Sequence, residues 1–313
     1  MKNNQLQLPE KDPIICATHS GSFHADDVFA GAILQMICEQ LGRTCEIIRT
    51  RDESLLAAAD IVFDVGQQYD TETLRFDHHQ QEGAGEHEVA PISYASCGLI
   101  WKHFSHYLVS GDDIALEIEK RIIIPVDAID TGVSLSENKF DEYGVYAYSI
   151  SHLIGDLKPT WRESNVSLLE RYQQAVDIAE IALRRQITIV EDAVMASDIV
   201  QDIYEKTVDK RIIVLPMNYP WHRTLSAYPE PQFVLGPEKE KEGWRLRFIP
   251  KVLGQFPARA YLPESWWGLS GKELQDISGV GDATFCHRAG VFAGAGSLEG
   301  IQRMAEIALG TGE

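Results

Sequence analysis

The sequence has few cysteines and no long hydrophobic run. Its five cysteines among 313 residues are an odd number and form no Cys-x-x-Cys pair, which is typical of reduced, buried thiols in a reducing compartment. No apolar run reaches the roughly 18 residues that a membrane helix needs. The polar start MKNNQLQLPEKD also lacks the apolar core of a signal peptide. We therefore expect a cytoplasmic protein that does not bind membranes.

Basic residues are scarce as well. The chain has 28 Lys and Arg against 47 Asp and Glu, which gives a formal net charge of -19. Long duplex DNA is bound mainly through Lys and Arg that neutralise its phosphates, so we do not expect it as a partner. A small phosphorylated ligand is compatible with this charge, because bound metal ions would reverse the local field.

The N-terminal part alternates apolar runs of strand type with helical patterns. Strands are predicted over 13–20, 45–50, 60–66 and 74–79, and helices over 26–42 and 52–59. This alternation predicts βαβ units and a parallel sheet. In such sheets the ligand lies beyond the carboxyl ends of the strands.

Glycine and proline are absent from residues 163–205, which we predict to be helical throughout. Further helices are predicted over 95–109 and 112–130, and after residue 210 the pattern changes to short strands, turns and one closing helix. The predicted fold class is α/β, with a parallel-sheet N-terminal domain over 1–195 that includes connecting helices. A smaller α+β C-terminal domain is predicted over 206–313.

A first cluster of polar side chains lies in HSGSFHADD. In extended backbone, residues i and i+2 point the same way, so His24 and Asp26 could face one site, with His19 arriving from the strand end. Imidazole and carboxylate together suit Mn²⁺, Zn²⁺ or Fe²⁺ better than Mg²⁺ alone. The alternative is that Asp26 caps the following helix and that the histidines are ordinary polar loop residues.

Two more clusters follow the next strands. Asp64 stands among apolar neighbours in IVFDVG, and a buried carboxylate needs a partner, which a salt bridge, a turn or a metal could supply. Asp77, His78 and His79 belong to RFDHHQ, and a strand that continued through them would send the two histidines to opposite sides. One histidine could then bind metal while the other reaches a substrate oxygen or a carboxylate, and Asp77 could orient a histidine.

The fourth cluster is the pair Asp127 and Asp130 in VDAIDTG. Their i, i+3 spacing places both on one helix face, although Asp130 is also compatible with a simple helix-ending turn. Together the clusters supply more ligands than one ion requires. Two ions about 3.5–4 Å apart, bridged by a carboxylate, activate water and clamp phosphoryl oxygens, and we predict that Asp64 is the bridge.

The ordered series of clusters resembles the DHH phosphoesterase superfamily, which includes RecJ-like exonucleases, oligoribonucleases and manganese-dependent inorganic pyrophosphatases. More closely, the chain resembles the MYG1 family of predicted metal-dependent phosphohydrolases. The similar segments run in order over essentially the whole chain and are THSGSFHADD, DVGQQYD, RFDHHQ, SCGLIWKHF, VDAIDTG, LKPTW, PARAYLPESWWGLSGKELQDISGVGDATFCHRAGVFAGA and the last helix. The resemblance implies a DHH-type catalytic domain and degradation of RNA from the 3′ end. It also implies a metal cofactor, Mn²⁺ or Mg²⁺, with two ions at the site.

The resemblance also assigns roles to residues. The implied metal ligands are His19, His24, Asp26, Asp64, His78 and either or both of Asp127 and Asp130. His79 is implied to contact the phosphate, and Asp77 is the second residue predicted to act in catalysis. The family usually has FHCDE where this chain has FHADD, so Asp27 is not carried over as a required group.

The C-terminal domain carries basic residues interleaved with aromatic ones, a combination that suits the stacking of single-stranded bases. The candidate substrate-binding residues are Arg245, Arg247, Lys251, Arg259, His287 and Arg288, among Trp244, Phe248, Trp266 and Trp267. The alternative is that the aromatic residues belong to the core and that the charges are only solvated. A Gly-rich substrate loop of the superfamily is matched only loosely, by HRAGVFAGAG.

The site residues therefore predict a divalent-metal-dependent phosphodiester hydrolase, and the resemblance implies a 3′-5′ exoribonuclease that acts on short single-stranded RNA. One alternative is a phosphohydrolase for a small phosphorylated substrate such as pyrophosphate or a cyclic dinucleotide, which the acidic charge favours slightly. Another is a non-catalytic binding protein that metal stabilises. The oligomeric state is left open, with a homodimer among the alternatives.

Overall fold

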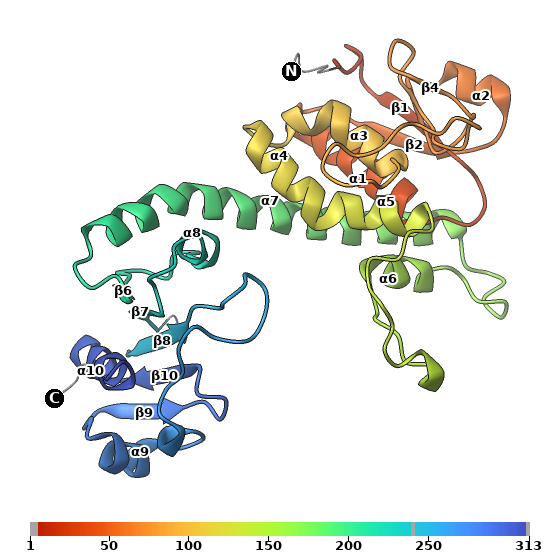
Figure 1. Cartoon of the computed structure of the whole chain (residues 1–313). Coiled ribbons are helices and arrows are strands. Elements are labelled where there is room, and N and C mark those ends of the chain that lie inside the picture. Colours follow the sequence, from red (N-terminus) through yellow and green to blue (C-terminus); the bar gives the residue numbers. More distant parts are fainter. Residues whose placement is uncertain (1–5, 239–241, 311–313) are drawn as a thin grey trace. The chain divides into compact units, whose positions relative to one another are not determined.

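The computed structural model describes residues 6–238 and 242–310. The chain divides into two compact units, one that ends at Val190 and one that begins at Glu191. This boundary falls inside the long helix α7 (Leu168–Lys206), which runs without interruption through the stretch that lacks glycine and proline (Figure 1). No helix within the described ranges is both long and apolar enough to span a bilayer.

The N-terminal unit contains a five-stranded sheet in the order β2-β1-β3-β5-β4. The strands are β1 (Ile14–Thr18), β2 (Cys45–Arg49), β3 (Ile61–Phe63), β4 (Tyr69–Asp70) and β5 (Arg75–Phe76). β1 pairs in parallel with β2 and β3, and β3 pairs in parallel with β5, whereas β4 is antiparallel to β5. The predicted parallel sheet is confirmed for four strands. The strand predicted over 74–79 is shorter than expected because β5 ends at Phe76.

Helices cover this sheet. They are α1 (Ala25–Gln40), α2 (Glu53–Ala58), α3 (Ser96–Phe104), α4 (Asp112–Ile118), α5 (Ile124–Asp130) and α6 (Ile150–Asp156), with 3₁₀ turns η1 (Ser105–Tyr107) and η3 (Asp141–Tyr143). The helix predicted over 112–130 is one run in which a π-helical turn, η2 (Glu119–Ile123), separates α4 from α5. The turn shortly precedes Pro125, which cannot donate a backbone hydrogen bond to the preceding turn.

The core of the N-terminal unit surrounds α1. Apolar side chains occur on nearly all sides of this helix, and Val28, Phe29, Ile33 and Ile37 are fully buried, as expected for a helix at the centre of a unit. Residues from α3 and from the first half of α7, such as Tyr172, belong to the same core. The first turn of α1 is therefore held firmly in place, and it is this turn that carries Asp26 and Asp27.

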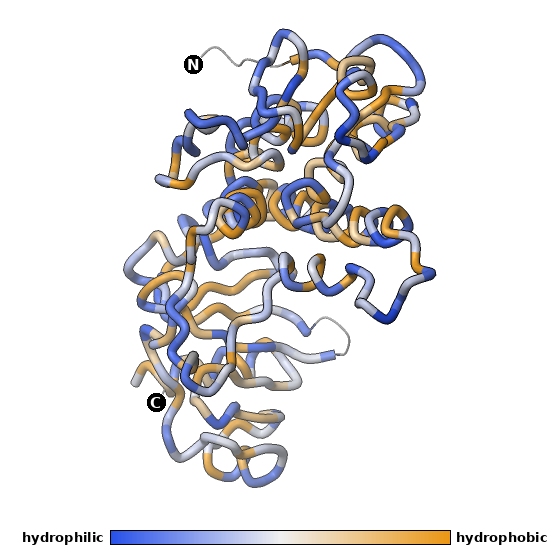
Figure 2. The backbone as a smooth tube through the Cα atoms, turned by 90° about the vertical axis from the view of Figure 1, so that its right-hand side faces the viewer, coloured by the Kyte–Doolittle hydropathy of each residue, from blue (hydrophilic) through white to orange (hydrophobic). Residues whose placement is uncertain are grey.

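The C-terminal unit has its own five-stranded sheet in the order β6-β7-β8-β10-β9. Its elements are β6 (Ile212–Val214), α8 (His222–Ser226), β7 (Phe233–Pro237), β8 (Trp244–Phe248), η4 (Glu264–Trp266), α9 (Gly271–Ser278), β9 (Ala283–Cys286), β10 (Phe292–Ala295) and α10 (Leu298–Ala308). Only the β6–β7 pair is parallel among the described pairings of this sheet. Hydrophobic strands alternate with hydrophilic loops (Figure 2), and α10 buries Ile301 and Met304 against the sheet core. The predicted fold class, α/β with a smaller α+β C-terminal part, is confirmed.

Candidate metal centre

The parallel strands deliver the predicted polar side chains to one edge of the N-terminal sheet. His19 directly follows β1, Asp64 follows β3, and residues 77–79 follow β5. Because these three strands are parallel, their carboxyl ends meet at the same edge. Residues at the N-terminus of α1 and at the C-terminus of α5 reach the same place.

Ligand atoms of these side chains form three groups, and within each group all the atoms lie within 4.8 Å of one another. The groups are His19, Asp27 and Asp64; His24, Asp26 and Asp130; and Asp64, Asp77, His78 and His79. Asp64 belongs to two of the three. A cavity of about 300 Å³ opens onto the groups, and its lining includes His19, His24, Asp64, Asp77, His79 and Asp130. The structure thus brings together every predicted metal ligand except Asp127.

Asp64 occupies the centre of the cluster. Its two carboxylate oxygens lie 3.2 Å from His19 Nε2 and 3.4 Å from His78 Nε2. Its backbone has a φ of 54°, in the left-handed region that few residues other than glycine adopt. Burial raises the pKa of Asp64, but the rings of His19 and His78 outweigh that effect and lower this pKa to about 2. Asp64 is therefore a charged carboxylate that faces two histidines, and its backbone conformation is of a kind that occurs preferentially at functional sites.

Asp26 is the least satisfied charged group of the cluster. Its side chain is fully buried, and among the residues that the structure describes none donates a hydrogen bond to either of its oxygens. Burial and the neighbouring carboxylates of Asp64 and Asp130 raise the pKa of Asp26 well above its usual value. A buried carboxylate without donors is costly, and a divalent cation would remove that cost.

His78 faces the same space. Its Nε2 lies 3.8 Å from Asp26, 3.4 Å from Asp64 and 3.3 Å from Asp130. Burial lowers the pKa of His78, but the carboxylates of Asp130 and Asp64 outweigh it and raise this pKa to about 10. An imidazole nitrogen directed at three carboxylates is the kind of mixed donor set that transition-metal ions prefer. The residues present therefore fit a divalent ion.

Asp27, which the sequence analysis does not include among the ligands, lies beside Asp64 in this cluster. Unlike Asp26, it accepts a hydrogen bond, from the backbone N–H of His24 at 2.7 Å. Its second oxygen has no hydrogen-bond donor among the described residues, and lies 3.4 Å from His19 Nε2 and 3.9 Å from Arg49 Nη2. Burial and the charge of Asp64 raise the pKa of Asp27 to about 7. The sequence feature that could have identified Asp27 is its position three residues after the N-cap His24, where an acidic side chain closes a capping box.

The two histidines of RFDHHQ lie side by side, with ring centroids 4.2 Å apart. The prediction that they point to opposite sides is wrong, because β5 ends at Phe76 and strand alternation does not extend to them. Asp77 accepts hydrogen bonds from the N–H groups of Gln67 at 2.6 Å and His78 at 2.8 Å, and lies 2.7 Å from His79 Nδ1. Asp77 thus fixes the turn and the ring of His79, whose side chain remains 55% exposed.

Asp127 lies outside the three groups, in a separate buried network. It accepts hydrogen bonds from His87 Nε2 at 2.8 Å and from the backbone N–H of Gly98 at 3.0 Å. The other ring nitrogen of His87 lies 2.6 Å from Glu119. A Cβ atom at Gly98 would stand 1.9 Å from an Asp127 oxygen, so only glycine leaves room for this carboxylate. Of the two aspartates of VDAIDTG, Asp130 therefore belongs to one of the three groups, whereas Asp127 is engaged by His87 and Gly98.

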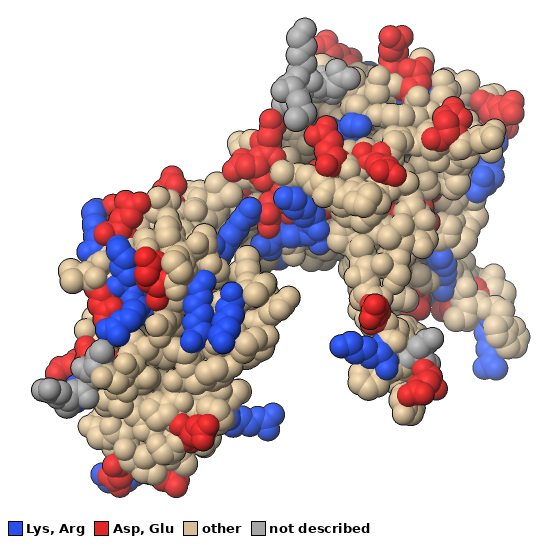
Figure 3. All heavy atoms as spheres, viewed as in Figure 1, with Lys and Arg blue, Asp and Glu red and all other residues tan. Residues whose placement is uncertain are grey.

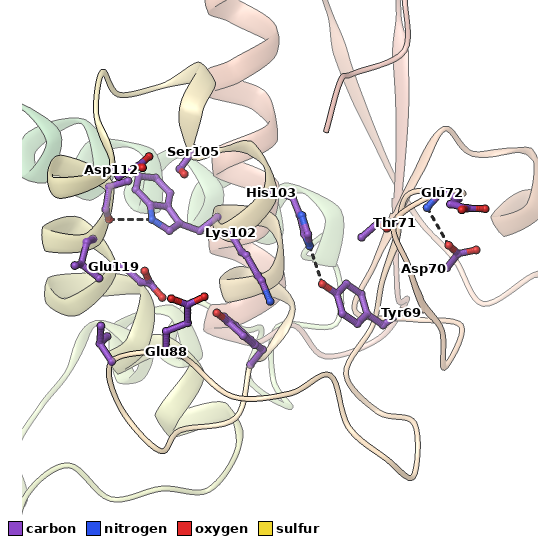
Figure 4. A pocket seen from close by; sticks show the side chains of 15 residues that line it. Tyr69, Asp70, Thr71, Glu72, Glu88, Lys102, His103, Ser105, Asp112 and Glu119 are labelled. Carbon is purple, nitrogen blue, oxygen red and sulfur yellow. Dashed lines mark hydrogen bonds between the residues drawn. The ribbon is translucent and has the colours of Figure 1, made fainter. Parts of the chain in front are cut away.

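His87 is absent from the sequence analysis, because GEHEVA shows neither periodicity nor a ligand spacing that would distinguish it. Its partner Glu119 lines a different cavity of about 820 Å³, in which Glu88 and Lys102 also lie and where His103 meets the hydroxyl of Tyr69 at 2.7 Å (Figure 4). The His87 network therefore connects this cavity wall to α5, the helix that ends at Asp130.

The candidate substrate residues of the C-terminal unit are mostly engaged within the chain. Lys and Arg side chains gather on the face of this unit shown in Figure 3. The guanidinium of Arg259, however, donates to the backbone carbonyls of Ser226, Tyr228, Pro231 and Pro250. Such a set of bonds holds loops together, so the structure does not support the predicted substrate-binding role of Arg259.

The remaining residues of that set differ in exposure. Arg245 pairs with Glu238, and Arg247 donates to Asn218 at 3.2 Å. Trp266, one of the predicted stacking residues, is buried in the core, which corrects its assignment. His287 and Arg288 are exposed and keep the access that a substrate contact requires.

Comparison with known proteins places this geometry in context. A family model described as an uncharacterised protein family, UPF0160, matches residues 15–309. The MYG1 exonuclease of Bos taurus is 29% identical over 93% of this chain and 84% of its own length, and that of Homo sapiens is 28% identical over 93% and 85%. A MYG1 protein of Saccharomyces cerevisiae is 32% identical over 94% of this chain and 95% of its own length.

Solved structures also show similarity, at low scores. A structure of RecJ in complex with Mn²⁺ from Thermus thermophilus is 13% identical, with a TM-score of 0.28, and the match covers 94% of this chain and 52% of that one. A structure of exonuclease RecJ bound to manganese is also 13% identical, with a TM-score of 0.27 and coverage of 94% and 89%.

Proposed function

Because the chain belongs to the MYG1 exonuclease family (UPF0160), we propose that it is a divalent-metal-dependent phosphodiester hydrolase that removes nucleotides from short single-stranded RNA in the 3′ to 5′ direction. The observation that carries the metal dependence is the buried carboxylate of Asp26, to which no described residue donates a hydrogen bond. Relatives of this chain bear the name exonuclease, which supports a nucleic-acid substrate.

We assign two ions, Mn²⁺ or Mg²⁺, to positions that share Asp64. His19 completes one position with Asp64, while Asp26, His78 and Asp130 would hold the other, with His24 beside them. Bound ions of this kind supply a hydroxide at neutral pH and stabilise negative charge on phosphoryl oxygens. The mixture of imidazole and carboxylate ligands favours Mn²⁺ over Mg²⁺.

Residues with partners inside the chain would position the others. Asp27 holds the backbone of His24 and faces His19, and Asp77 fixes the ring of His79 through Nδ1. Held in this way, His79 can present its Nε2 to the cavity and donate a hydrogen bond to a phosphate oxygen. His79 is therefore the residue to which we assign direct contact with the substrate.

The test uses a five-nucleotide RNA labelled at either end, the same sequence as DNA, and pyrophosphate, each with Mn²⁺ and with Mg²⁺. We expect shortening of the RNA one nucleotide at a time from its 3′ end, faster with Mn²⁺. Release of phosphate from pyrophosphate with no action on RNA would instead support the small-molecule alternative. No hydrolysis of any substrate, despite metal binding, would support the non-catalytic alternative.

Two variants separate the assigned roles. His78→Ala should lower Mn²⁺ affinity by roughly 10-fold or more, on the scale known for disturbed metal sites, whereas His79→Ala should leave bound metal unchanged and lower kcat. Isothermal titration with Mn²⁺ and turnover of the RNA measure the two effects. Loss of metal in His79→Ala with retention in His78→Ala would reverse the assignment.

A further inference from the structure

The segment LKPTW is one of the family-like motifs, yet it contributes no side chain to the metal groups. It links α6 to α7, and its Trp161 is 87% exposed. Tryptophan is usually among the most buried residues on average, so a side chain this large and this exposed requires a reason. Arg162 lies over the Trp161 ring, with its Cζ 4.8 Å from the ring centroid.

The other end of the segment lies next to the metal centre. The ammonium group of Lys158 stands 5.8 Å from the ring centroid of Phe23, the buried residue that directly precedes His24. The segment therefore begins with a cation beside Phe23, the residue that precedes His24, and ends with an exposed indole paired with a second cation.

Further exposed rings lie between α5 and α6. This stretch follows Asp130 directly and extends away from the helices of the N-terminal unit (Figure 1). Phe140, Tyr143, Tyr146 and Tyr148 are all exposed in it, and the rings of Tyr146 and Tyr148 flank the ring of His152 at 5.4 and 5.7 Å. The segment after Asp130 thus carries aromatic side chains open to solvent, as Trp161 is in the segment between α6 and α7.

We propose that Leu157–Arg162 forms a subsite for single-stranded nucleic acid, in which Lys158 meets a phosphate next to the scissile one and Trp161 stacks on a base of the remaining strand. Exposed aromatic rings and interleaved cations are the features that bind single strands without sequence preference. The position of Lys158 beside Phe23, next to the candidate ligand His24, favours a substrate strand over a protein partner, because a strand that reaches the ligand groups would bring its phosphates near this cation. This inference rests on the proposed nuclease function and adds one substrate contact in the N-terminal unit.

The test compares Trp161→Ala, Trp161→Phe and Lys158→Ala with Phe256→Ala, a control that removes another exposed ring, 68% exposed, in the C-terminal unit. With Mn²⁺, we expect Trp161→Ala to raise KM for the five-nucleotide RNA about 10-fold, within the range known for loss of one base stack, with kcat nearly unchanged. Trp161→Phe should keep KM within about 3-fold because phenylalanine still stacks. Hydrolysis of bis(p-nitrophenyl) phosphate, which has no strand to stack, should be unaffected by both Trp161 variants and by the control.

A second readout does not depend on turnover. In EDTA, oligonucleotide binding should quench the tryptophan fluorescence of the wild-type protein, and Trp161→Phe should lose most of that quenching. If the wild type hydrolyses RNA but Trp161→Ala changes neither KM nor quenching, the subsite is wrong while the nuclease function stands. If quenching depends on Trp161 but no RNA is hydrolysed, the nuclease function is wrong and the binding site stands.

Two further outcomes would overturn the subsite. An equal loss on RNA and on the small phosphodiester would show that Trp161 acts on the catalytic centre as a whole. A wild-type protein that self-associates in light scattering, and that becomes monomeric in Trp161→Ala, would show that the exposed rings bind another copy of the chain.

Discussion

Charged side chains are concentrated in two regions: the sheet edge of the N-terminal unit that carries the candidate metal ligands, and the arginine-bearing strands and loops of the C-terminal unit. The two regions differ in how those charges are satisfied. At the N-terminal edge, no described residue donates a hydrogen bond to the buried carboxylate of Asp26. In the C-terminal unit, by contrast, the guanidinium of Arg259 has four backbone carbonyls as acceptors. A charge whose partners all belong to the chain stabilises the fold. One that is buried without partners indicates a ligand from outside.

Two neighbouring residues of α1 also differ in whether the chain supplies a hydrogen-bond donor to their carboxylates. Asp26 and Asp27 are both fully buried, yet Asp27 accepts a backbone hydrogen bond and lies near His19 and Arg49, while Asp26 has no donor among the described residues. Adjacent residues of identical chemistry therefore have different roles. One is suited to hold metal and the other to hold the residues around it.

The largest expected effect follows from this pair. Asp26→Asn should weaken Mn²⁺ binding at least about 100-fold and abolish turnover, because it removes a ligand, whereas Asp27→Asn should cost about 10-fold, as for a group that orients ligands. In EDTA, Asp26→Asn should also raise the free energy of unfolding by about 1–2 kcal/mol, since the amide removes a carboxylate that burial makes costly either to ionise or to keep protonated. Titration calorimetry and urea unfolding measure both effects. If Asp26→Asn kept the metal affinity of the wild type, the proposal that Asp26 binds metal while Asp27 orients the ligands would be wrong.

How far the sequence predicts this site depends on the kind of signal. Strand ends and the polar residues that follow them are local patterns, and the parallel pairing of β1, β3 and β5 then brings His19, Asp64 and His78 together, so these positions could be predicted. The direction of His79 could not, because a difference of a few residues in the end of β5 decides whether alternation applies. Nor could the separation of Asp127 from Asp130, which depends on a partner, His87, 40 residues earlier in the chain.

The same limit applies to the arginines of the C-terminal unit. Composition identifies them as candidates, but the acceptors of Arg259 lie 9 to 33 residues away in sequence. Whether a guanidinium is occupied by carbonyls or remains available to phosphate is a property of tertiary structure. The sequence pattern therefore identifies a polar residue as a candidate, whereas its contacts in the folded chain determine its role.

His87 is a buried side chain of the N-terminal unit whose partners, Asp127 and Glu119, belong to the chain. Burial lowers the pKa of His87, but Asp127 and Glu119 outweigh it and raise this pKa to about 9. A raised histidine pKa contributes stability that is fully present below the unfolded value near ~6.5 and is lost as pH rises through about 9. In EDTA, His87→Gln should lower the free energy of unfolding by about 3 kcal/mol at pH 6 and by much less at about pH 9.5.

Urea unfolding of wild type and His87→Gln across this pH range gives the difference directly. Gln can still donate one hydrogen bond to Asp127 but carries no charge, so it isolates the contribution of the imidazolium. A difference that stays constant from about pH 6 to about pH 9.5 would mean that His87 is neutral in the fold. The inference that a protonated His87 links Glu119 to Asp127 would then be wrong.

The smallest effects distinguish two members of the arginine set. Arg259→Ala should lower the stability of the protein by about 2 kcal/mol, because four carbonyls lose a charged donor, while Arg288→Ala should change it by less than about 0.5 kcal/mol, as is usual at the surface. RNA binding should show the opposite order: Arg288→Ala weakens it by a small factor through loss of one phosphate contact, and Arg259→Ala leaves it unchanged at temperatures where the variant is folded. Thermal unfolding and fluorescence anisotropy of a labelled RNA separate the two readouts. The contrary result would be that Arg259→Ala weakens RNA binding without loss of stability. That result would mean that a guanidinium with four carbonyl acceptors is still available to the substrate. The number of partners within the chain would then not distinguish structural from functional charges.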